Sequence, residues 1–202
     1  MELRARYTRE GRLPSGLWRV SAHATTGDDG QVATESVEAG SLLWAVSEGV
    51  EGSLAHVSLS DDLLPEAPAL WFVQVDEPRG SPAATNLVAF ADPALEPGTV
   101  VTKFRYGGLG VANDRQVGAV RWYRDGGKVH QVFVAKEWRR QRVASALLYT
   151  ADAVHQANGW TGHLHGDSRR TALGQLMIES FRHPQRIALL DRIMPPMDPD
   201  PT

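Results

Sequence analysis

The stretch from Lys128 to Gln156 constrains the fold most strongly, because a short apolar strand leads within a few residues into a helix. The residues VHQVFV at 129–134 predict a buried strand. From Val143 onward, apolar residues recur at three- and four-residue spacing, which predicts an amphipathic helix over 143–156. Three arginines and a glutamine occupy 139–142, where this helix begins. Because helix N-termini present unpaired N–H groups and the positive end of the macrodipole, the junction predicts a phosphate-binding site.

The residues before this junction predict further antiparallel strands. Alternating residues at 117–124 predict a strand, and Asp125-Gly126-Gly127 is typical of a tight hairpin turn into the next one. Residues 100–106 also predict a strand. The glycine cluster that follows at 107–110 lacks the lysine of a P-loop, so we expect a flexible turn there.

The residues after the helix predict one more strand and one more helix. Residues 160–166, WTGHLHG, predict the strand, and Asp167 or Ser168 is expected to cap the last helix. Pro184 is expected to interrupt or end that helix. The remaining residues are rich in proline and are expected to form a frayed tail.

The first half of the chain predicts strands separated by turn-forming residues. These strands are expected at 17–25, 41–46, 54–59, 70–75 and, more briefly, 86–90. A Pro- and Ala-rich connection at 77–97 indicates a boundary. We therefore expect a β-rich N-terminal region at 1–97, a core at 98–190 and a Pro-rich tail at 191–202.

Composition excludes several classes of protein. The chain has no cysteine, which excludes disulfide scaffolds, cysteine zinc sites and thiolate nucleophiles. Its formal net charge of −3 does not indicate a nucleic-acid-binding protein, although a local basic patch at Arg4–Arg12 leaves an RNA-contacting arm as an alternative to a solvated edge strand. No apolar run reaches the roughly 18–20 residues that cross a bilayer, and the N-terminus lacks a hydrophobic signal core, so we expect a cytoplasmic protein.

The strand, turn and helix at 129–156 resemble motif A of the GNAT acyltransferases. The family consensus at the turn is Gln/Arg-x-x-Gly-x-Gly/Ala, and Arg-Arg-Gln-Arg-Val-Ala at 139–144 falls in register with it. The residues SALL at 145–148 match a frequent continuation of the helix. The hairpin at 117–134 also resembles the central strands of that fold. The resemblance covers about residues 98–182 and leaves the N-terminal half outside.

The resemblance implies an α/β (α+β) fold with a mixed, mostly antiparallel central sheet flanked by helices, here with a β-rich N-terminal extension. It implies acetyl-CoA or another acyl-CoA as co-substrate and an amine as acceptor. In the family the fourth strand pairs with the pantetheine arm and the turn holds the pyrophosphate. The residues implied to bind the cofactor are Gln131, Val132, Phe133, Val134, Arg139, Arg140, Gln141, Arg142, Val143, Ala144 and Ser145.

His130 is the predicted catalytic base. It lies four residues before Val134 on the strand that would bind the cofactor, and a histidine occupies a similar place in serotonin N-acetyltransferase-like members of the family. An imidazole titrates near neutral pH, which suits removal of a proton from the attacking amine. The alternative is a strand histidine that only packs or makes hydrogen bonds.

The chain departs from the family at two points. Arg142 replaces the first consensus glycine, and its side chain would either crowd the CoA or bind a phosphate. The chain also has no tyrosine on the last helix, where many members hold a general acid. Tyr149 lies on the cofactor helix and is interpreted as packing. Ser168 and Thr171 are the nearest hydroxyls, and helix capping explains them equally well.

No metal site is predicted. His163 and His165 would share a face of the expected strand. A zinc site there lacks a third ligand at diagnostic spacing, and a pair of histidines lining the acceptor cleft is an equal alternative.

Two hypotheses about function follow. The first is an N-acyltransferase that passes an acyl group directly from the thioester to an amine. The second is a catalytically degenerate GNAT-like scaffold whose β-rich N-terminal half binds a protein or nucleic-acid partner. The absence of the consensus glycine and of the tyrosine favours the second hypothesis, whereas the motif itself favours the first.

Overall fold

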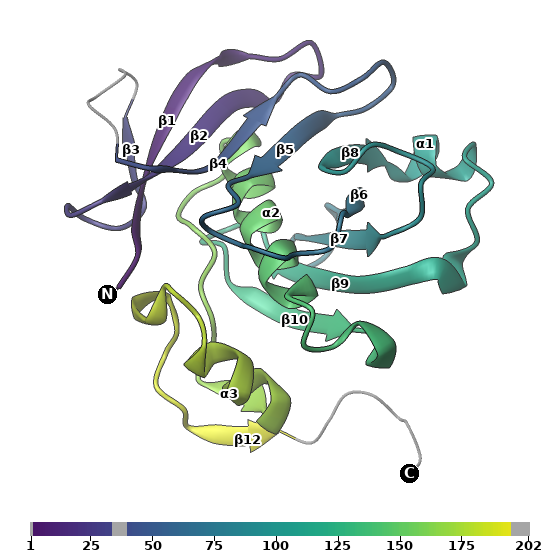
Figure 1. Cartoon of the computed structure of the whole chain (residues 1–202). Coiled ribbons are helices and arrows are strands. Elements are labelled where there is room, and N and C mark those ends of the chain that lie inside the picture. Colours follow the sequence, from purple (N-terminus) through teal and green to yellow (C-terminus); the bar gives the residue numbers. More distant parts are fainter. Residues whose placement is uncertain (1, 34–39, 195–202) are drawn as a thin grey trace.

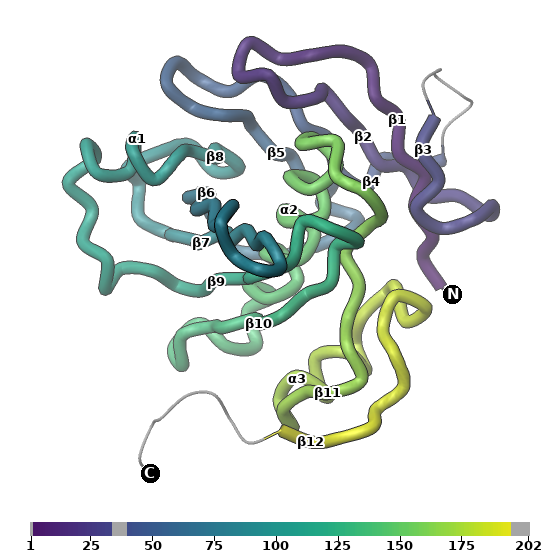
Figure 2. The backbone as a smooth tube through the Cα atoms, turned by 180° about the vertical axis from the view of Figure 1, so that it is seen from behind, coloured from purple at the N-terminus to yellow at the C-terminus, as the bar shows by residue number. Residues whose placement is uncertain are grey.

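A ten-stranded sheet curves around one long helix, α2 (Val143–Ala157), in the computed structural model of the chain (Figures 1 and 2). The structure describes residues 2–33 and 40–194. The strands of the sheet, in chain order, are β1 (Arg4–Arg12), β2 (Trp18–Thr25), β3 (Gln31–Ala33), β4 (Leu42–Ser47), β5 (Ala55–Leu59), β6 (Trp71–Glu77), β7 (Ala84–Phe90), β8 (Thr99–Thr102), β9 (Gln116–Tyr123) and β10 (Val129–Val134).

The sheet is mostly antiparallel, as expected. Its strand order is β10-β9-β7-β6-β8-β5-β4-β2-β1-β3, and only the β1–β3 and β6–β8 pairs are parallel. The boundary predicted at residue 97 lies within this sheet, because β8 follows it and pairs with both β5 and β6. The helix α2 likewise packs against β2, β4 and β5 as well as β9 and β10.

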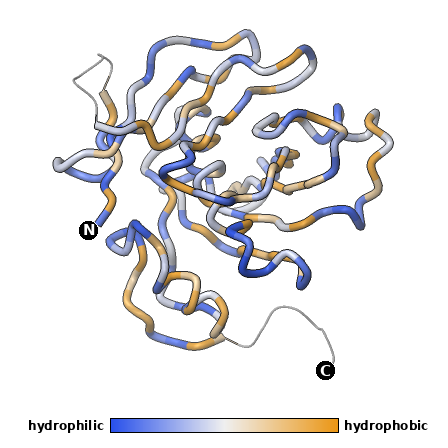
Figure 3. The backbone as a smooth tube through the Cα atoms, viewed as in Figure 1, coloured by the Kyte–Doolittle hydropathy of each residue, from blue (hydrophilic) through white to orange (hydrophobic). Residues whose placement is uncertain are grey.

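The hydrophobic core lies between α2 and the concave face of the sheet. Apolar and polar residues are interspersed along the strands (Figure 3), and buried residues alternate with more exposed ones along β2 and β9. In β6 and β8, by contrast, residues on both faces are buried. Thirteen of the fifteen residues of α2 are buried. Trp44 and Trp122 are fully buried against this core, whereas Trp71 packs with Phe90 and Tyr106 in a second, smaller cluster.

The C-terminal part of the chain forms a small lobe beside the N-terminus (Figures 1 and 2). It contains α3 (Ala172–Glu179), the 3₁₀-turn η3 (Pro184–Arg186) and a two-stranded parallel ribbon of β11 (Arg169–Thr171) and β12 (Arg192–Met194). The ribbon was not predicted. The proline-rich tail expected at 191–202 falls outside the described residues from 195 onward.

Most strands predicted from the sequence are confirmed, and three predicted elements differ. The strand expected at 100–106 ends at Thr102, because the Thr102 hydroxyl accepts from the N–H of Arg105 at 3.1 Å and begins α1 (Lys103–Gly107). Two further 3₁₀-turns, η1 (Asn113–Arg115) and η2 (Lys136–Trp138), precede β9 and α2 respectively.

Residues 160–166 make only isolated bridges, one from His165 to Lys128 and one from Gly166 to Ile187, instead of a regular strand. A left-handed glycine, Gly162, has φ of +78° and interrupts the extended backbone. The last helix begins later than expected. Its N-cap is Thr171, because the Asp167 carboxylate is already bound by Lys128 at 2.7 Å.

Among the described residues, every helix is too short or too polar to cross a membrane.

Candidate acyl-CoA site

One side of β10 has almost no backbone partner, although the strand begins beside another segment. The N–H of Val129 donates to the carbonyl of His165 at 2.9 Å, and the N–H of His165 donates to the carbonyl of Gly127 at 3.2 Å. After this contact the two segments separate, because Gly166 pairs with Ile187 of the C-terminal lobe instead. Since β10 is also the last strand of the sheet, the rest of its outer edge borders no other strand among residues 2–33 and 40–194.

The backbone groups on this edge belong to Val132 and Val134. The N–H of Ala135 donates to the carbonyl of Val117 at 3.0 Å, and N–H groups alternate in direction along an antiparallel strand. The N–H and C=O groups of Val132 and Val134 are therefore directed away from β9. The carbonyl of Val134 accepts from Nε of Arg139 at 3.2 Å, which confirms that it is directed outward.

The turn between β10 and α2 contains two left-handed arginines. Arg140 and Arg142 both have φ of +63°, and both are exposed. Arg142 is the N-cap residue of α2 and caps it with no side-chain hydrogen bond. A left-handed backbone is the conformation that glycine adopts without steric cost, so Arg142 carries a guanidinium at a position whose backbone favours glycine.

The other residues expected to bind the cofactor lie around this junction. Val143 is buried in the core, while Ala144 and Ser145 are partly exposed in the first turn of α2. The side chain of Gln141 donates to the carbonyl of Glu137 at 2.7 Å and so holds the turn together. Gln131 and Phe133 lie on β10 and are partly buried. The expected residues are therefore gathered along one path, from the edge of β10 to the start of α2.

His130 lies on the face of β10 that is turned away from α2. A register shift separates Val129 from Gln131, and His130 lies within it. Val129, Val132 and Val134 pack against the core, whereas His130 is exposed and its Nδ1 lies 3.2 Å from the hydroxyl of Tyr123. The predicted base therefore stands beside the edge that would hold a thioester, with a tyrosine orienting its ring.

A cavity of about 70 Å³ lies on the opposite face of β10, between this strand, α2 and α3. Its lining is mostly apolar. The lining side chains and backbone come from Val129, Val132, Leu148, Tyr149, Asp152, Leu164, His165, Gly166, Met177, Ile178, Phe181, Arg186 and Ile187. The edge of β10 therefore separates a cavity on one face from His130 on the other.

Tyr149 has a role that the sequence did not predict. Its ring stacks on Phe181 with centroids 5.7 Å apart, which agrees with the packing role expected from the sequence. It also lines the cavity, and its hydroxyl makes no hydrogen bond with any residue in the described part of the chain. Burial raises the pKa of Tyr149 to about 12, so the phenol is neutral at physiological pH.

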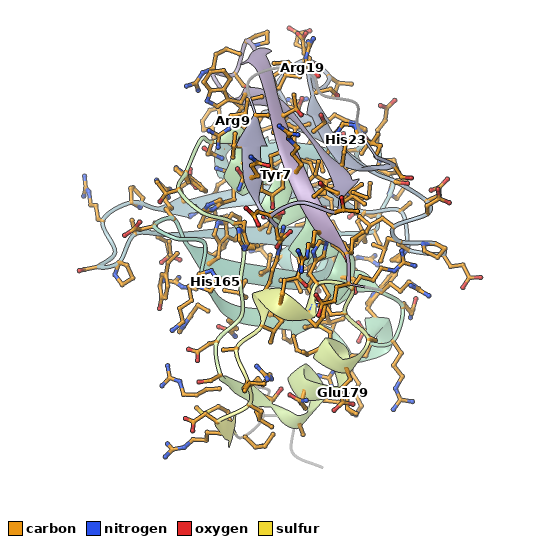
Figure 4. The ribbon with its side chains drawn as sticks, turned by 90° about the vertical axis from the view of Figure 1, so that its left-hand side faces the viewer. Tyr7, Arg9, Arg19, His23, His165 and Glu179 are labelled. Carbon is orange, nitrogen blue, oxygen red and sulfur yellow. The ribbon has the colours of Figure 1, made fainter. Side chains whose placement is uncertain are left out.

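A buried ionic cluster closes the inner end of the cavity. Arg186 donates to both oxygens of Asp29, at 2.6 Å from Nε and 2.9 Å from Nη2, and to Asp152 at 3.1 Å from Nη1. Tyr7 points from β1 into the interior (Figure 4), and its hydroxyl donates to Asp152 at 2.6 Å. Burial tends to raise the pKa of Asp29, but the hydrogen bonds and charge of Arg186 outweigh it and lower the pKa to about 2.

Two histidines stand next to this cluster. Nδ1 of His183 lies 3.9 Å from Asp29, and Nε2 of His163 lies 3.8 Å from the same carboxylate. Burial, reinforced by the charge of Arg186, lowers the pKa of both imidazoles, that of His183 to about 4. His165 lines the cavity instead. Within residues 2–33 and 40–194, no group of three histidines or acids is placed to hold a metal ion.

The cluster was missed in the sequence because its members are far apart in the chain. Asp29 belongs to the segment GDDG at 27–30, whose composition indicates only a turn. Asp152 stands between two alanines within the apolar part of α2, and this was the one local signal of a buried acid.

Comparisons of the chain with protein-family models, with curated proteins and with solved structures each returned no significant match.

Proposed function

We propose that this chain is a cytoplasmic N-acyltransferase with a GNAT-like core, which passes an acyl group from a CoA thioester directly to an amine. The observation that carries the proposal is the outer edge of β10. This edge offers backbone groups at Val132 and Val134 and leads within nine residues to the start of α2, where Arg140 and Arg142 are exposed. It thus combines a partner for an extended amide chain with a partner for phosphate.

The cofactor would lie along this path. The pantetheine amides would add to β10 as an extra strand does, through the N–H and C=O of Val132. The pyrophosphate would lie against the N–H groups at 143–145, which are the first of α2, and beside the guanidinium of Arg142. The resemblance of 139–144 to motif A supports the same assignment.

The chemistry needs one base and one polarised carbonyl. The amine nitrogen attacks the thioester carbon, the C–N bond forms, and a tetrahedral oxyanion develops that a backbone N–H of β10 would stabilise. The C–S bond then breaks, and the thiolate leaves as CoA. His130 would take the proton that the amine loses, and the acceptor would approach from the exposed face where His130 and Tyr123 lie.

Tyr149 would serve the leaving group as a hydrogen-bond donor. Its pKa of about 12 lies well above the roughly 8.5 of an ordinary thiol, so the phenol keeps its proton next to a thiolate. A neutral hydroxyl without a partner among the described residues is suited to this task. It would stabilise the departing sulfur by charge-assisted hydrogen bonding.

The scaffold hypothesis is the second candidate, and one contact favours it. Nε of Arg139 occupies the carbonyl of Val134, which is one of the edge groups that a pantetheine amide would use. In a degenerate descendant this contact would be permanent. The exposed Arg140 and Arg142 would then bind a protein or nucleic-acid partner instead of CoA.

Calorimetric titration with acetyl-CoA discriminates between the two hypotheses. The acyltransferase binds with a micromolar dissociation constant, and the double variant Arg140→Glu/Arg142→Glu weakens binding at least tenfold. The matched control is Arg79→Glu/Arg115→Glu, which makes the same change of charge at two exposed positions outside this junction. No binding at millimolar acetyl-CoA would exclude the acyltransferase, and equal loss in both double variants would exclude the assigned phosphate site.

A further inference from the structure

We infer that the cavity beside β10 receives the aliphatic chain of the acyl group, and that the thioester this protein uses carries about four to six carbons instead of two. The inference rests on the proposed function, since it places the thioester at the edge of β10. It adds the class of acyl group, which neither the motif nor the turn specifies.

The position of the cavity is the first support. Val129 and Val132 line it with their side chains, while the backbone of Val132 forms part of the outer edge of the same strand. A thioester held at that edge has its acyl group within reach of the cavity on the α2 side. The amine acceptor then has the opposite face, where His130 is exposed.

The carboxylate of the lining, that of Asp152, is the second support, because it is already paired. Oδ1 of Asp152 accepts from the N–H of Leu164 at 3.1 Å, and its Oδ2 accepts from Tyr7 and from Arg186. An ammonium or amine ligand would need an unpaired carboxylate or carbonyl in the cavity. Among the described residues that line the cavity, Asp152 alone has a carboxylate, and both of its oxygens are engaged, so this space fits a hydrocarbon chain and not the amine.

The volume of the cavity determines how long an acyl chain it can hold. A water-sized group needs about 10–15 Å³ of such space, so a cavity of about 70 Å³ holds about five of them. An acetyl group supplies a single methyl and would leave most of the space empty. A butyryl or hexanoyl chain would fill it, and the flexible side chain of Met177 at the α3 side allows the fit to adjust.

The test is a calorimetric series with CoA, acetyl-CoA, butyryl-CoA, hexanoyl-CoA and decanoyl-CoA. Each buried methylene is expected to tighten binding about fourfold, up to hexanoyl-CoA, with no further gain for decanoyl-CoA. If acetyl-CoA binds as tightly as butyryl-CoA and hexanoyl-CoA, the acyl pocket is wrong while the proposed function stands. If CoA and all its thioesters fail to bind, the proposed function itself is overturned, and the pocket with it.

A pair of variants on α3 tests whether the acyl chain lies in the cavity. Ile178 lines the cavity and is only partly buried, so Ile178→Phe fills space there, whereas Leu176→Phe makes the same kind of change at an exposed position of the same helix. We expect Ile178→Phe to weaken hexanoyl-CoA at least tenfold and to leave CoA unchanged, and Leu176→Phe to alter neither. Ile178→Ala should move the preferred length toward decanoyl-CoA. Equal effects of Ile178→Phe on CoA and hexanoyl-CoA would overturn the assignment.

Discussion

Arg186 and Asp29 stand 157 residues apart in the chain and meet as a two-bond fork, with Nε–Oδ2 at 2.6 Å and Nη2–Oδ1 at 2.9 Å. The same guanidinium reaches Asp152 on α2. Arg186 belongs to η3 of the C-terminal lobe, whereas Asp29 lies in the turn before β3. One buried cation thereby fastens the lobe to both the first strands and the central helix.

Removing this cation is expected to be severely destabilising. Arg186→Met leaves the carboxylates of Asp29 and Asp152 buried without their counter-charge, so the free energy of unfolding should fall by about 3–5 kcal/mol. Urea denaturation followed by tryptophan fluorescence measures the change. The control is Arg169→Met, because the side chain of Arg169 is 57% exposed and its pair with Asp167 should be worth less than about 1 kcal/mol.

A double-mutant cycle measures the interaction free energy between Arg186 and Asp29 separately from their other contacts. Arg186→Met combined with Asp29→Asn should cost less than the sum of the two single changes, since the second change removes one of the stranded charges. Strict additivity would mean that the fork contributes nothing beyond packing.

His183 should make the protein sensitive to mild acid. It is neutral in the folded state, because burial and the nearby Arg186 lower its pKa to about 4, whereas the unfolded chain titrates near the ordinary value of about 6.5. Between these values only the unfolded chain gains the proton. The contribution of His183 to the free energy of unfolding should therefore be constant above pH 6.5 and fall by about 3 kcal/mol as the pH drops to 4.

The comparison of His183→Gln with His130→Gln tests this assignment. His183 is 2% exposed, so its replacement should make the stability profile less steep between pH 6.5 and 4. His130 is exposed, and its replacement should leave the slope unchanged. A profile for His183→Gln that is as steep as that of the parent protein would show that another group is responsible.

Arg142 can be tested for two separate effects, one on the backbone and one on the ligand. A left-handed backbone destabilises a residue that has a side chain by about 1–2 kcal/mol. Glycine avoids this steric cost, but it loses about 0.5–1 kcal/mol more conformational entropy on folding. Arg142→Gly should therefore stabilise the fold by about 0.5–1 kcal/mol in thermal or urea unfolding. Arg142→Ala keeps the left-handed cost and should give no such gain.

Both Arg142 variants should bind CoA more weakly, by about 1.5–3 kcal/mol, because both lose a charged hydrogen bond to phosphate. Calorimetry measures the loss. If either variant bound CoA more tightly than the parent, the guanidinium would be an obstruction and not a ligand.

The role of His130 is expected to appear in the rate of turnover. A general base contributes about 10²–10⁴-fold, so His130→Ala should lower kcat by at least a hundredfold. Tyr123→Phe removes the hydroxyl that lies 3.2 Å from Nδ1 and should lower kcat less, with KM unchanged. Full turnover by His130→Ala at every pH would eliminate it as the base.

Local pattern predicted the parts of the structure that depend on neighbouring residues. The bounds of β10 agree with the prediction, and α2 extends it by one residue, because period-two and period-3.6 apolar spacing are read directly from the sequence. Local pattern failed at 100–106 and 160–166. There a single cap at Thr102 and a left-handed glycine at 162 overrode an otherwise strand-like composition.

The candidate site also has one part that local sequence pattern predicts and one part that it does not. The path from Val132 to Arg142 is contiguous in sequence and was predicted as such, although its left-handed backbone was not. The cavity and the cluster around Arg186 depend on side chains brought together from β1, α2, α3 and η3. Short spacing carries no signal for contacts that span up to 179 residues, such as that of Arg186 with Tyr7.

The enclosure of α2 by the sheet has a consequence for the synthesis of the chain. The strands from β1 to β9 leave the ribosome before the helix that covers their concave face, and at about 5–20 residues per second the first of them waits on the order of ten seconds. During that time a broad apolar surface faces water without its partner. The nascent chain should therefore bind a holding chaperone until residue 157 has emerged, and then be released.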